Sequence, residues 1–168
     1  MVRLLSIVTA ASLAAVARAD HLVTVKNTCA SKTITPIFHA GTVTTTMAAI
    51  GNGGVTSIVV PEAQLSWRIF GQTGTCGFPD GGGCTLLECS FDNPSFRQCN
   101  LSRVDGFNVG MTFSFSDGSC AGNNCLTSTC DGNHAFSDPT NGGPSIRQCN
   151  TPNVGMTFVL LSFFIRFS

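Results

Sequence analysis

The stretch Leu65-Ser-Trp-Arg-Ile-Phe70 decides the fold class. It is short and rich in β-branched and aromatic residues, and glycine-rich turns lie on either side of it, at Gly51-Asn-Gly-Gly54 and Pro79-Asp-Gly-Gly-Gly83. This is the pattern of a β-strand between turns. Segments of the same kind lie at residues 21–26, 33–38, 42–47 and 55–60. No window beyond residue 19 keeps a 3.6-residue apolar period for three turns, so the sequence predicts an all-β sandwich or barrel with little helix.

The first nineteen residues have the organisation of a secretory signal peptide. Arg3 is followed by an apolar run at residues 4–16, and Ala17-Arg-Ala19 fits a cleavage site before Asp20. The apolar run is too short to cross a bilayer. We therefore expect residues 1–19 to be removed and residues 20–168 to form one secreted domain.

All the cysteines lie beyond the predicted signal, and their number is odd. The 9 cysteines are Cys29, Cys76, Cys84, Cys89, Cys99, Cys120, Cys125, Cys130 and Cys149. In an oxidising compartment such a density predicts a disulfide framework, in which one cysteine has no partner.

Charge and spacing exclude several classes of ligand. The cysteine spacings are irregular, no CxxC occurs, and the 3 histidines are scattered, so neither a metal site nor a cofactor is expected. Without Arg3 and Arg18, the basic side chains are fewer than the 9 acidic ones, and no Lys/Arg run occurs. Nucleic acid and anionic membranes are therefore poor partners, and a neutral or cationic ligand is easier to accommodate.

One motif pair occurs twice. Residues 94–100 (Pro-Ser-Phe-Arg-Gln-Cys-Asn) and 108–113 (Asn-Val-Gly-Met-Thr-Phe) recur, with one change, at residues 144–150 and 153–158. Because a solenoid needs at least three units, we interpret the copies as two similar strand pairs of one sandwich. A recent duplication is the alternative.

Several motifs along the chain resemble those of one known family. They are Val-Lys-Asn-Thr-Cys29, Trp67-Arg-Ile-Phe-Gly-Gln-Thr-Gly74, Thr85-Leu-Leu-Glu88, Val104-Asp-Gly-Phe-Asn-Val109, and Cys130 with Ala135-Phe-Ser137. In this order they resemble a small-type thaumatin-like protein of the thaumatin/osmotin family. The resemblance implies a flattened, disulfide-stapled β-sandwich with an acidic cleft, in a family whose members bind or cleave β-1,3-glucans or act against fungi.

The same resemblance implies a disulfide pairing. The four implied pairs are Cys76–Cys84, Cys89–Cys99, Cys120–Cys149 and Cys125–Cys130. In the family the first cysteine pairs with one at the extreme C-terminus, whereas residues 159–168 here form an atypical tail without a cysteine. Cys29 is therefore expected to be unpaired. A misassigned last exon and a genuine alternative terminus both remain open.

The resemblance also places an acidic cleft. Arg68, Glu88 and Asp105 match the family pattern, and Asn100 stands where an Asp is usual. For the last acidic position Asp138 is the nearest carboxylate, although the register points nearer to residue 141.

If the protein is an enzyme, Glu88 would be the acid and Asp105 the base of glycoside cleavage. The alternative is that both are ordinary carboxylates paired with Arg68 and Arg103. Phe107 is a candidate cleft wall, whereas Trp67 is better explained as core.

A glycosylation sequon overlaps the cleft. Asn100-Leu-Ser102 is the one N-x-[ST] sequon without proline. The cleft position of Asn100 and its neighbour Cys99 argue against its occupancy.

Three functions remain open. The first is a secreted monomer that binds β-1,3-glucan or another cell-wall polysaccharide, with an antifungal or defence-type role. The second is an endo-β-1,3-glucanase on the same scaffold, and the third is a secreted cell-wall or effector protein that acts through its surface. Asn100 favours binding over catalysis, because a neutral amide cannot supply a proton as a carboxylic acid does.

Overall fold

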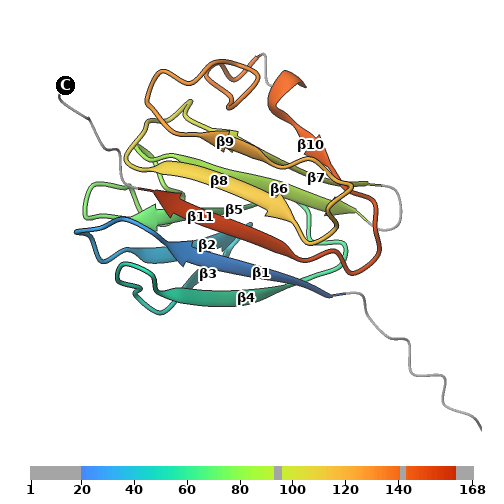
Figure 1. Ribbon diagram of the computed structural model, residues 1–168, viewed down its shortest axis with the longest axis horizontal. Coiled ribbons are helices and arrows are strands. Elements are labelled where there is room, and N and C mark those ends of the chain that lie inside the picture. The colour runs from blue at the N-terminus through green and yellow to red at the C-terminus, as the bar shows by residue number, and fades with distance from the viewer. Residues whose placement is uncertain (1–19, 93–95, 141–142, 162–168) are drawn as a thin grey trace, which may run out of the picture.

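The chain folds into a sandwich of two β-sheets (Figure 1). A computed structural model describes residues 20–92, 96–140 and 143–161. The predicted signal, residues 1–19, and residues 162–168 of the tail lie outside the described residues. The five-stranded sheet has the order β4 (Val55–Pro61), β1 (Asp20–Asn27), β11 (Met156–Leu161), β8 (Gly110–Phe115) and β9 (Asn123–Cys125). The six-stranded sheet has the order β10 (Arg147–Gln148), β7 (Phe96–Ser102), β6 (Leu86–Asp92), β5 (Trp67–Gln72), β2 (Thr35–Ala40) and β3 (Val43–Thr46).

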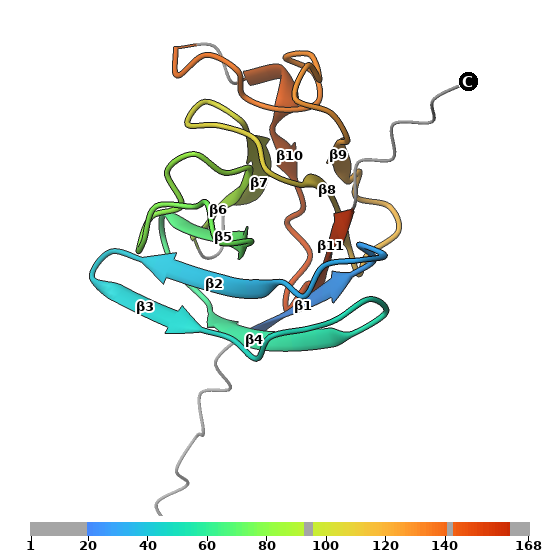
Figure 2. The ribbon, with the colours of Figure 1, turned by 90° about the vertical axis from the view of Figure 1, so that its left-hand side faces the viewer.

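The all-β prediction is confirmed. Among the described residues, helical structure is limited to one 3₁₀ turn at Gly143–Ser145. In that part of the chain no helix is long and apolar enough to cross a membrane. Figure 2 shows β5, β6 and β7 on one side of the sandwich and β8, β9 and β11 on the other.

Two of the predicted strands begin two residues later than expected, and both have a local reason. The strand predicted at 65–70 begins at Trp67, because Ala63 and Ser66 have positive φ angles of 64° and 48° that interrupt an extended backbone. The strand predicted at 33–38 begins at Thr35, because Ile34 instead forms an isolated bridge with Ile50.

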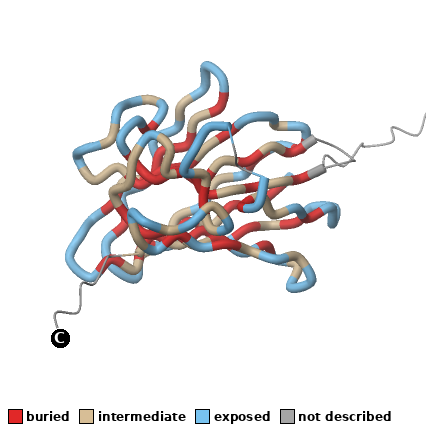
Figure 3. Tube along the Cα trace, turned by 90° about the horizontal axis from the view of Figure 1, so that it is seen from above, coloured by how far each residue is buried: buried red, intermediate tan, exposed pale blue. Residues whose placement is uncertain are grey.

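Alternating side chains fill the space between the sheets. Val23 and Val25 of β1 and Phe158 of β11 are fully buried, and Trp67 of β5 is only 1% exposed. Figure 3 shows the buried positions following the strands, while exposed positions gather in the connections. This is the packing expected where the inner faces of two sheets meet, and it places Trp67 in the core as predicted.

The two copies of the repeated motif pair with each other in both sheets. The first copy supplies β7 and β8, and the second supplies β10 and β11, so each copy gives one strand to each sheet. Equivalent residues face each other across the antiparallel pairs, Gln98 with Gln148 and Phe113 with Phe158. The copies are therefore two similar strand pairs related by a local two-fold arrangement.

Four disulfides staple the sandwich. They are Cys76–Cys84, Cys89–Cys99, Cys120–Cys149 and Cys125–Cys130, the same pairs that the resemblance implies. Cys29 is free and fully buried next to the end of β1.

We expect this free cysteine to be detectable as one protected thiol per chain. Because Cys29 has no exposed surface, alkylation of the native protein should leave it unmodified, whereas unfolding without a reductant should make it react. Peptide mapping by mass spectrometry measures both results. A Cys29 already bonded to another cysteine of the same chain would contradict the pairing.

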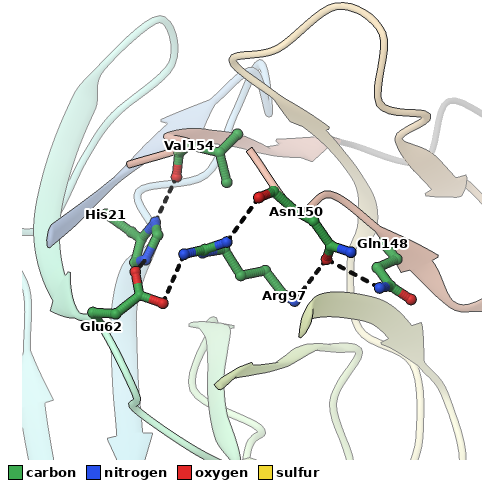
Figure 4. Close-up of polar contacts among 6 residues, drawn as sticks. All are labelled: His21, Glu62, Arg97, Gln148, Asn150 and Val154. Carbon is green, nitrogen blue, oxygen red and sulfur yellow. Dashed lines mark hydrogen bonds and ion pairs between the residues drawn. The ribbon is translucent and has the colours of Figure 1, made fainter. Parts of the chain in front are cut away.

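A buried ionic cluster joins the two sheets at one end (Figure 4). Glu62, which follows β4, has one carboxylate oxygen 2.8 Å from Nη2 of Arg97 on β7 and the other 2.7 Å from Nε2 of His21 on β1. Arg97 also donates to the carbonyl of Asn150 at 3.0 Å, and Nδ1 of His21 donates to the carbonyl of Val154 at 2.8 Å. The His21, Glu62 and Arg97 side chains are at most 6% exposed, so the buried charges of Glu62 and Arg97 depend on each other for compensation.

Candidate functional site

A row of polar side chains crosses the outer face of the six-stranded sheet. Arg68 of β5 is in register with Glu88 of β6, and Glu88 is in register with Asn100 of β7. Side chains at paired positions lie on the same face, and the neighbours of each row residue along its strand point into the core. Trp67 and Leu87, for example, are at most 1% exposed, while all three row residues are half-buried. The sheet thus brings together three of the predicted cleft residues.

A pocket of about 200 Å³ lies over this row. Its lining residues are Ser66, Trp67, Arg68, Glu88, Cys89, Ser90, Gln98 and Asn100. Asn100 Nδ2 donates to Glu88 Oε2 at 3.1 Å, and Arg68 Nη1 donates to the carbonyl oxygen of Asp80 at 3.4 Å. Among the described residues, Arg68 and Glu88 form no ion pair with each other. Neither charged group is therefore neutralised by the other, and both can contact a ligand in the pocket.

The loop closed by the Cys76–Cys84 disulfide covers the sheet beside this pocket. A small apolar cluster of Ile37, Phe70 and Leu86, packed against Cys76, lies beneath it. A Cβ at Gly81 would lie 2.7 Å from side-chain atoms of Phe70 and Leu86, and the φ of Gly81 is +84°. Only glycine permits such a close approach in this conformation, and it holds the loop against the sheet at the Arg68 end of the row.

Asp105 and Phe107 lie in the connection between β7 and β8 and do not line the pocket. The backbone of Asp105 joins them to the stapled loop, because its carbonyl accepts a hydrogen bond from the amide of Gly83 at 3.0 Å. The Asp105 side chain is exposed, and Phe107 is partly buried against the main core. The predicted pairing of Asp105 with Arg103 does not occur among the described contacts, in which Arg103 donates instead to the carbonyl of Cys130 at 2.9 Å.

Asp138 is exposed in a turn and does not line the pocket either. Its Oδ1 accepts hydrogen bonds from the amide and the hydroxyl of Thr140, at 2.8 and 2.7 Å. These bonds lower the pKa of Asp138 below its ordinary value, the backbone bond having the larger effect. The arrangement is that of a carboxylate that stabilises its own turn.

One further cluster contains the residue types of a metal site. Asp117 lies close to Cys120 and Cys149, but those two sulfur atoms are bonded to each other. The hydroxyls of Thr151 and Ser119 and the Ser119 amide lower the pKa of Asp117 to about 2. With its sulfurs in a disulfide, this cluster presents a single carboxylate and is a poor metal ligand set.

Sequence reasoning missed His39. It lies on β2 in register with Arg68, so it extends the row by one strand. The sequence does contain the pattern that identifies it, a polar residue between two apolar ones. Phe38 and Ala40 on either side of His39 are both 6% exposed. The predicted strand ended one residue too early to include it.

Comparisons with known proteins agree with this architecture. The thaumatin-like xylanase inhibitor TLXI has a TM-score of 0.61 at 19% identity, over 82% of this chain and 97% of the inhibitor. The protein elicitor MoHrip2 from Magnaporthe oryzae has a TM-score of 0.63 at 19% identity, over 84% of this chain and 99% of the elicitor. The chain has the thaumatin-like fold. The fold that the resemblance implied is thereby confirmed.

A relative is also found by sequence. The thaumatin-like protein PWIR2 of Triticum aestivum is 30% identical over 54% of this chain. The match spans 63% of the length of the Triticum aestivum protein. No protein-family model matches the chain.

Proposed function

We propose that this thaumatin-like chain is a secreted, monomeric polysaccharide-binding protein whose pocket takes a neutral glucan of the β-1,3-linked type. The composition of the pocket carries this proposal. Arg68 and Glu88 contribute one charge of each sign, and Ser66, Ser90 and Gln98 contribute uncharged hydrogen-bonding groups. Such a surface suits a neutral ligand rich in hydroxyl groups better than an ionic one.

The presence of a single carboxylate in the pocket lining favours binding over hydrolysis. Among the residues that line this pocket, Glu88 is the one carboxylate, and its partner across the strands is the amide of Asn100. Glycoside cleavage requires an acid and a second carboxylate on opposite sides of the scissile bond. Asp105, the proposed second carboxylate, is exposed on a loop outside the pocket lining.

A defence-type, extracellular role is consistent with the relatives. One structural neighbour is named as a xylanase inhibitor and another as a protein elicitor, and the sequence relative is a thaumatin-like protein. Four disulfides in a small β-domain suit an oxidising compartment such as the cell wall. An endo-β-1,3-glucanase is the second candidate, because Arg68 and Glu88 occupy the pocket that this activity would need.

The decisive experiment measures binding and turnover on the same material. We expect the protein to co-sediment with insoluble β-1,3-glucan and to release little or no reducing sugar from it. Glu88→Gln should abolish any residual turnover while most binding remains, because a glutamine keeps the hydrogen bond with Asn100. Asp131→Asn, an exposed change in the turn that follows Cys130, is the matched control.

The variant Asn100→Asp should bring little or no hydrolysis. It places a second carboxyl group where Asn100 Nδ2 lies 3.1 Å from Glu88 Oε2, whereas glycoside cleavage needs two carboxyls about 5–9.5 Å apart. Failure to co-sediment would reject the glucan proposal. Robust turnover by the unaltered chain that survives Glu88→Gln would place the chemistry on other residues.

A further inference from the structure

The five-stranded sheet ends in a long strand with one free edge. β4, at the lower edge of the sandwich in Figure 1, has 7 residues and pairs only with β1 among the described strands. The strands at the other three sheet edges, β9, β10 and β3, have 3, 2 and 4 residues. Proteins commonly protect an exposed edge by keeping it short or by placing charges or prolines along it. In β4 residues 55–61 carry no charge, and the one proline, Pro61, is at the last position.

The free edge of β4 presents backbone hydrogen-bonding groups. The amide of Asn27 donates to the carbonyl of Gly54 at 3.0 Å, which fixes the phase of the ladder between β1 and β4. Because the bonds alternate along an antiparallel pair, Val55, Ser57 and Val59 direct their N–H and C=O groups away from β1. In the part of the chain that the structure describes, no backbone group pairs with them. These donors and acceptors are therefore available to a further strand.

The side chains along this edge are apolar. Val55 and Val59 are 55% and 56% exposed, and Leu22 of β1, in register with Val59, is 52% exposed. On the other face of the strand, Ile58 is half-buried and packs against the main core. An added strand with apolar side chains would thus remove apolar surface from water on both faces of the sheet. Exposed apolar residues that gather in one place mark an interaction surface better than single ones do.

We propose that the free edge of β4 is a docking site for an extended, uncharged segment of another protein, which adds a sixth strand to the five-stranded sheet. Main-chain hydrogen bonds hold the segment, and its alternating apolar side chains provide the selectivity. Charge complementarity favours this occupant, because a charged segment would meet no opposite charge along residues 55–61. The inference is independent of the proposed glucan binding, since the pocket lies on the other sheet.

The test uses a synthetic peptide of the same length as β4, in which valine and threonine alternate, with two lysines added at one end for solubility. Amide hydrogen exchange of the ¹⁵N-labelled protein, measured by NMR, reports on each backbone N–H separately. The amides of Val55, Ser57 and Val59 should exchange rapidly in the free protein and about 10-fold more slowly with saturating peptide. A control peptide with proline at its central position should not slow them, because proline lacks the donor that pairing requires.

Ser57→Pro and Ser57→Ala form the matched pair of variants. Proline removes the N–H that points away from β1 and leaves the ladder with β1 intact, whereas alanine keeps this N–H. Ser57→Pro should weaken peptide binding about 10-fold, as expected for the loss of a hydrogen bond at a site where the ring also obstructs the added strand, and Ser57→Ala should not. Val59→Lys keeps every N–H and places a charge on the exposed face, so it should weaken binding about 3–10-fold without a change of backbone. A far-UV spectrum shows that each variant is folded.

Three results would overturn the docking site. One is unchanged exchange at the outward-facing amides when the alternating peptide is added, and another is equal binding of the peptide by Ser57→Pro and Ser57→Ala. The third is slowing of the same amides with rising protein concentration in the absence of peptide, which would identify a second copy of the chain as the occupant of the edge. None of these results bears on co-sedimentation with glucan, so the two proposals fail separately.

Discussion

Replacing Glu62 with glutamine is expected to lower the free energy of unfolding by about 3–5 kcal/mol, because it leaves a buried charge without its partner. Glu62 compensates Arg97, whose side chain is 3% exposed, and contacts His21, which is fully buried. A neutral amide cannot replace the carboxylate in both contacts. For a chain of this length, the loss corresponds to a melting temperature lower by about 10 °C.

Urea unfolding monitored by circular dichroism measures this loss. Glu88→Gln is the matched control, because Glu88 is a half-buried carboxylate without an ion pair among the described contacts. Its effect should stay within about 0.5 kcal/mol. The double replacement of Glu62 and Arg97 by glutamine should cost less than the sum of the two single replacements, since it removes both charges together. A loss below about 1 kcal/mol for Glu62→Gln would show that the buried pair contributes little.

The cluster around Glu62 also marks a limit of sequence reasoning. In the sequence, Glu62 follows Pro61 and reads as a charged residue in a turn. It is 7% exposed because the end of β4 lies beside β1 and beneath Arg97, which comes from the other sheet. Such burial depends on contacts between residues far apart in the sequence, and local pattern carries no information about them.

The strands were predictable because their signal is local. β-branched and aromatic residues between turn residues located the early strands to within a few positions. One error arose where a single residue adopts an uncommon backbone conformation, as Ser66 does before β5, and another where Ile34 forms an isolated bridge before β2. The repeated motif predicted two similar strand pairs, but not that the equivalent residues Phe113 and Phe158 would face each other.

The candidate site was predictable in part for the same reason. Arg68, Glu88 and Asn100 each lie on a strand, so strand register alone aligns them in one row. Asp105 and Asp138 lie in loops, and no regular pattern fixes the direction of a loop side chain. The structure does not place either of them in the pocket lining, and their roles remain proposals.

Disulfide removal is the second large effect that we expect, and the chain offers a matched comparison. The Cys120–Cys149 bridge has a sequence separation of 29, whereas the Cys125–Cys130 bridge has a separation of 5. Each bridge has one buried and one half-buried cysteine. The local cost of replacing the two cysteine side chains with serine should therefore be similar for the two bridges. The length of the loop that each bridge closes should then decide the difference in the free energy of unfolding.

Replacing both Cys120 and Cys149 with serine is expected to lower the free energy of unfolding by about 3.5 kcal/mol, and replacing Cys125 and Cys130 by about 2 kcal/mol. The difference arises because a long loop loses more conformational freedom in the unfolded chain when it is closed. Urea unfolding of both double variants without a reductant gives the two values directly. Equal losses would mean that local packing around the sulfur atoms, rather than the restriction of the unfolded chain, accounts for the stabilisation. A larger loss for the Cys125–Cys130 bridge would identify the β9 edge as the part of the sandwich that depends most on its staple.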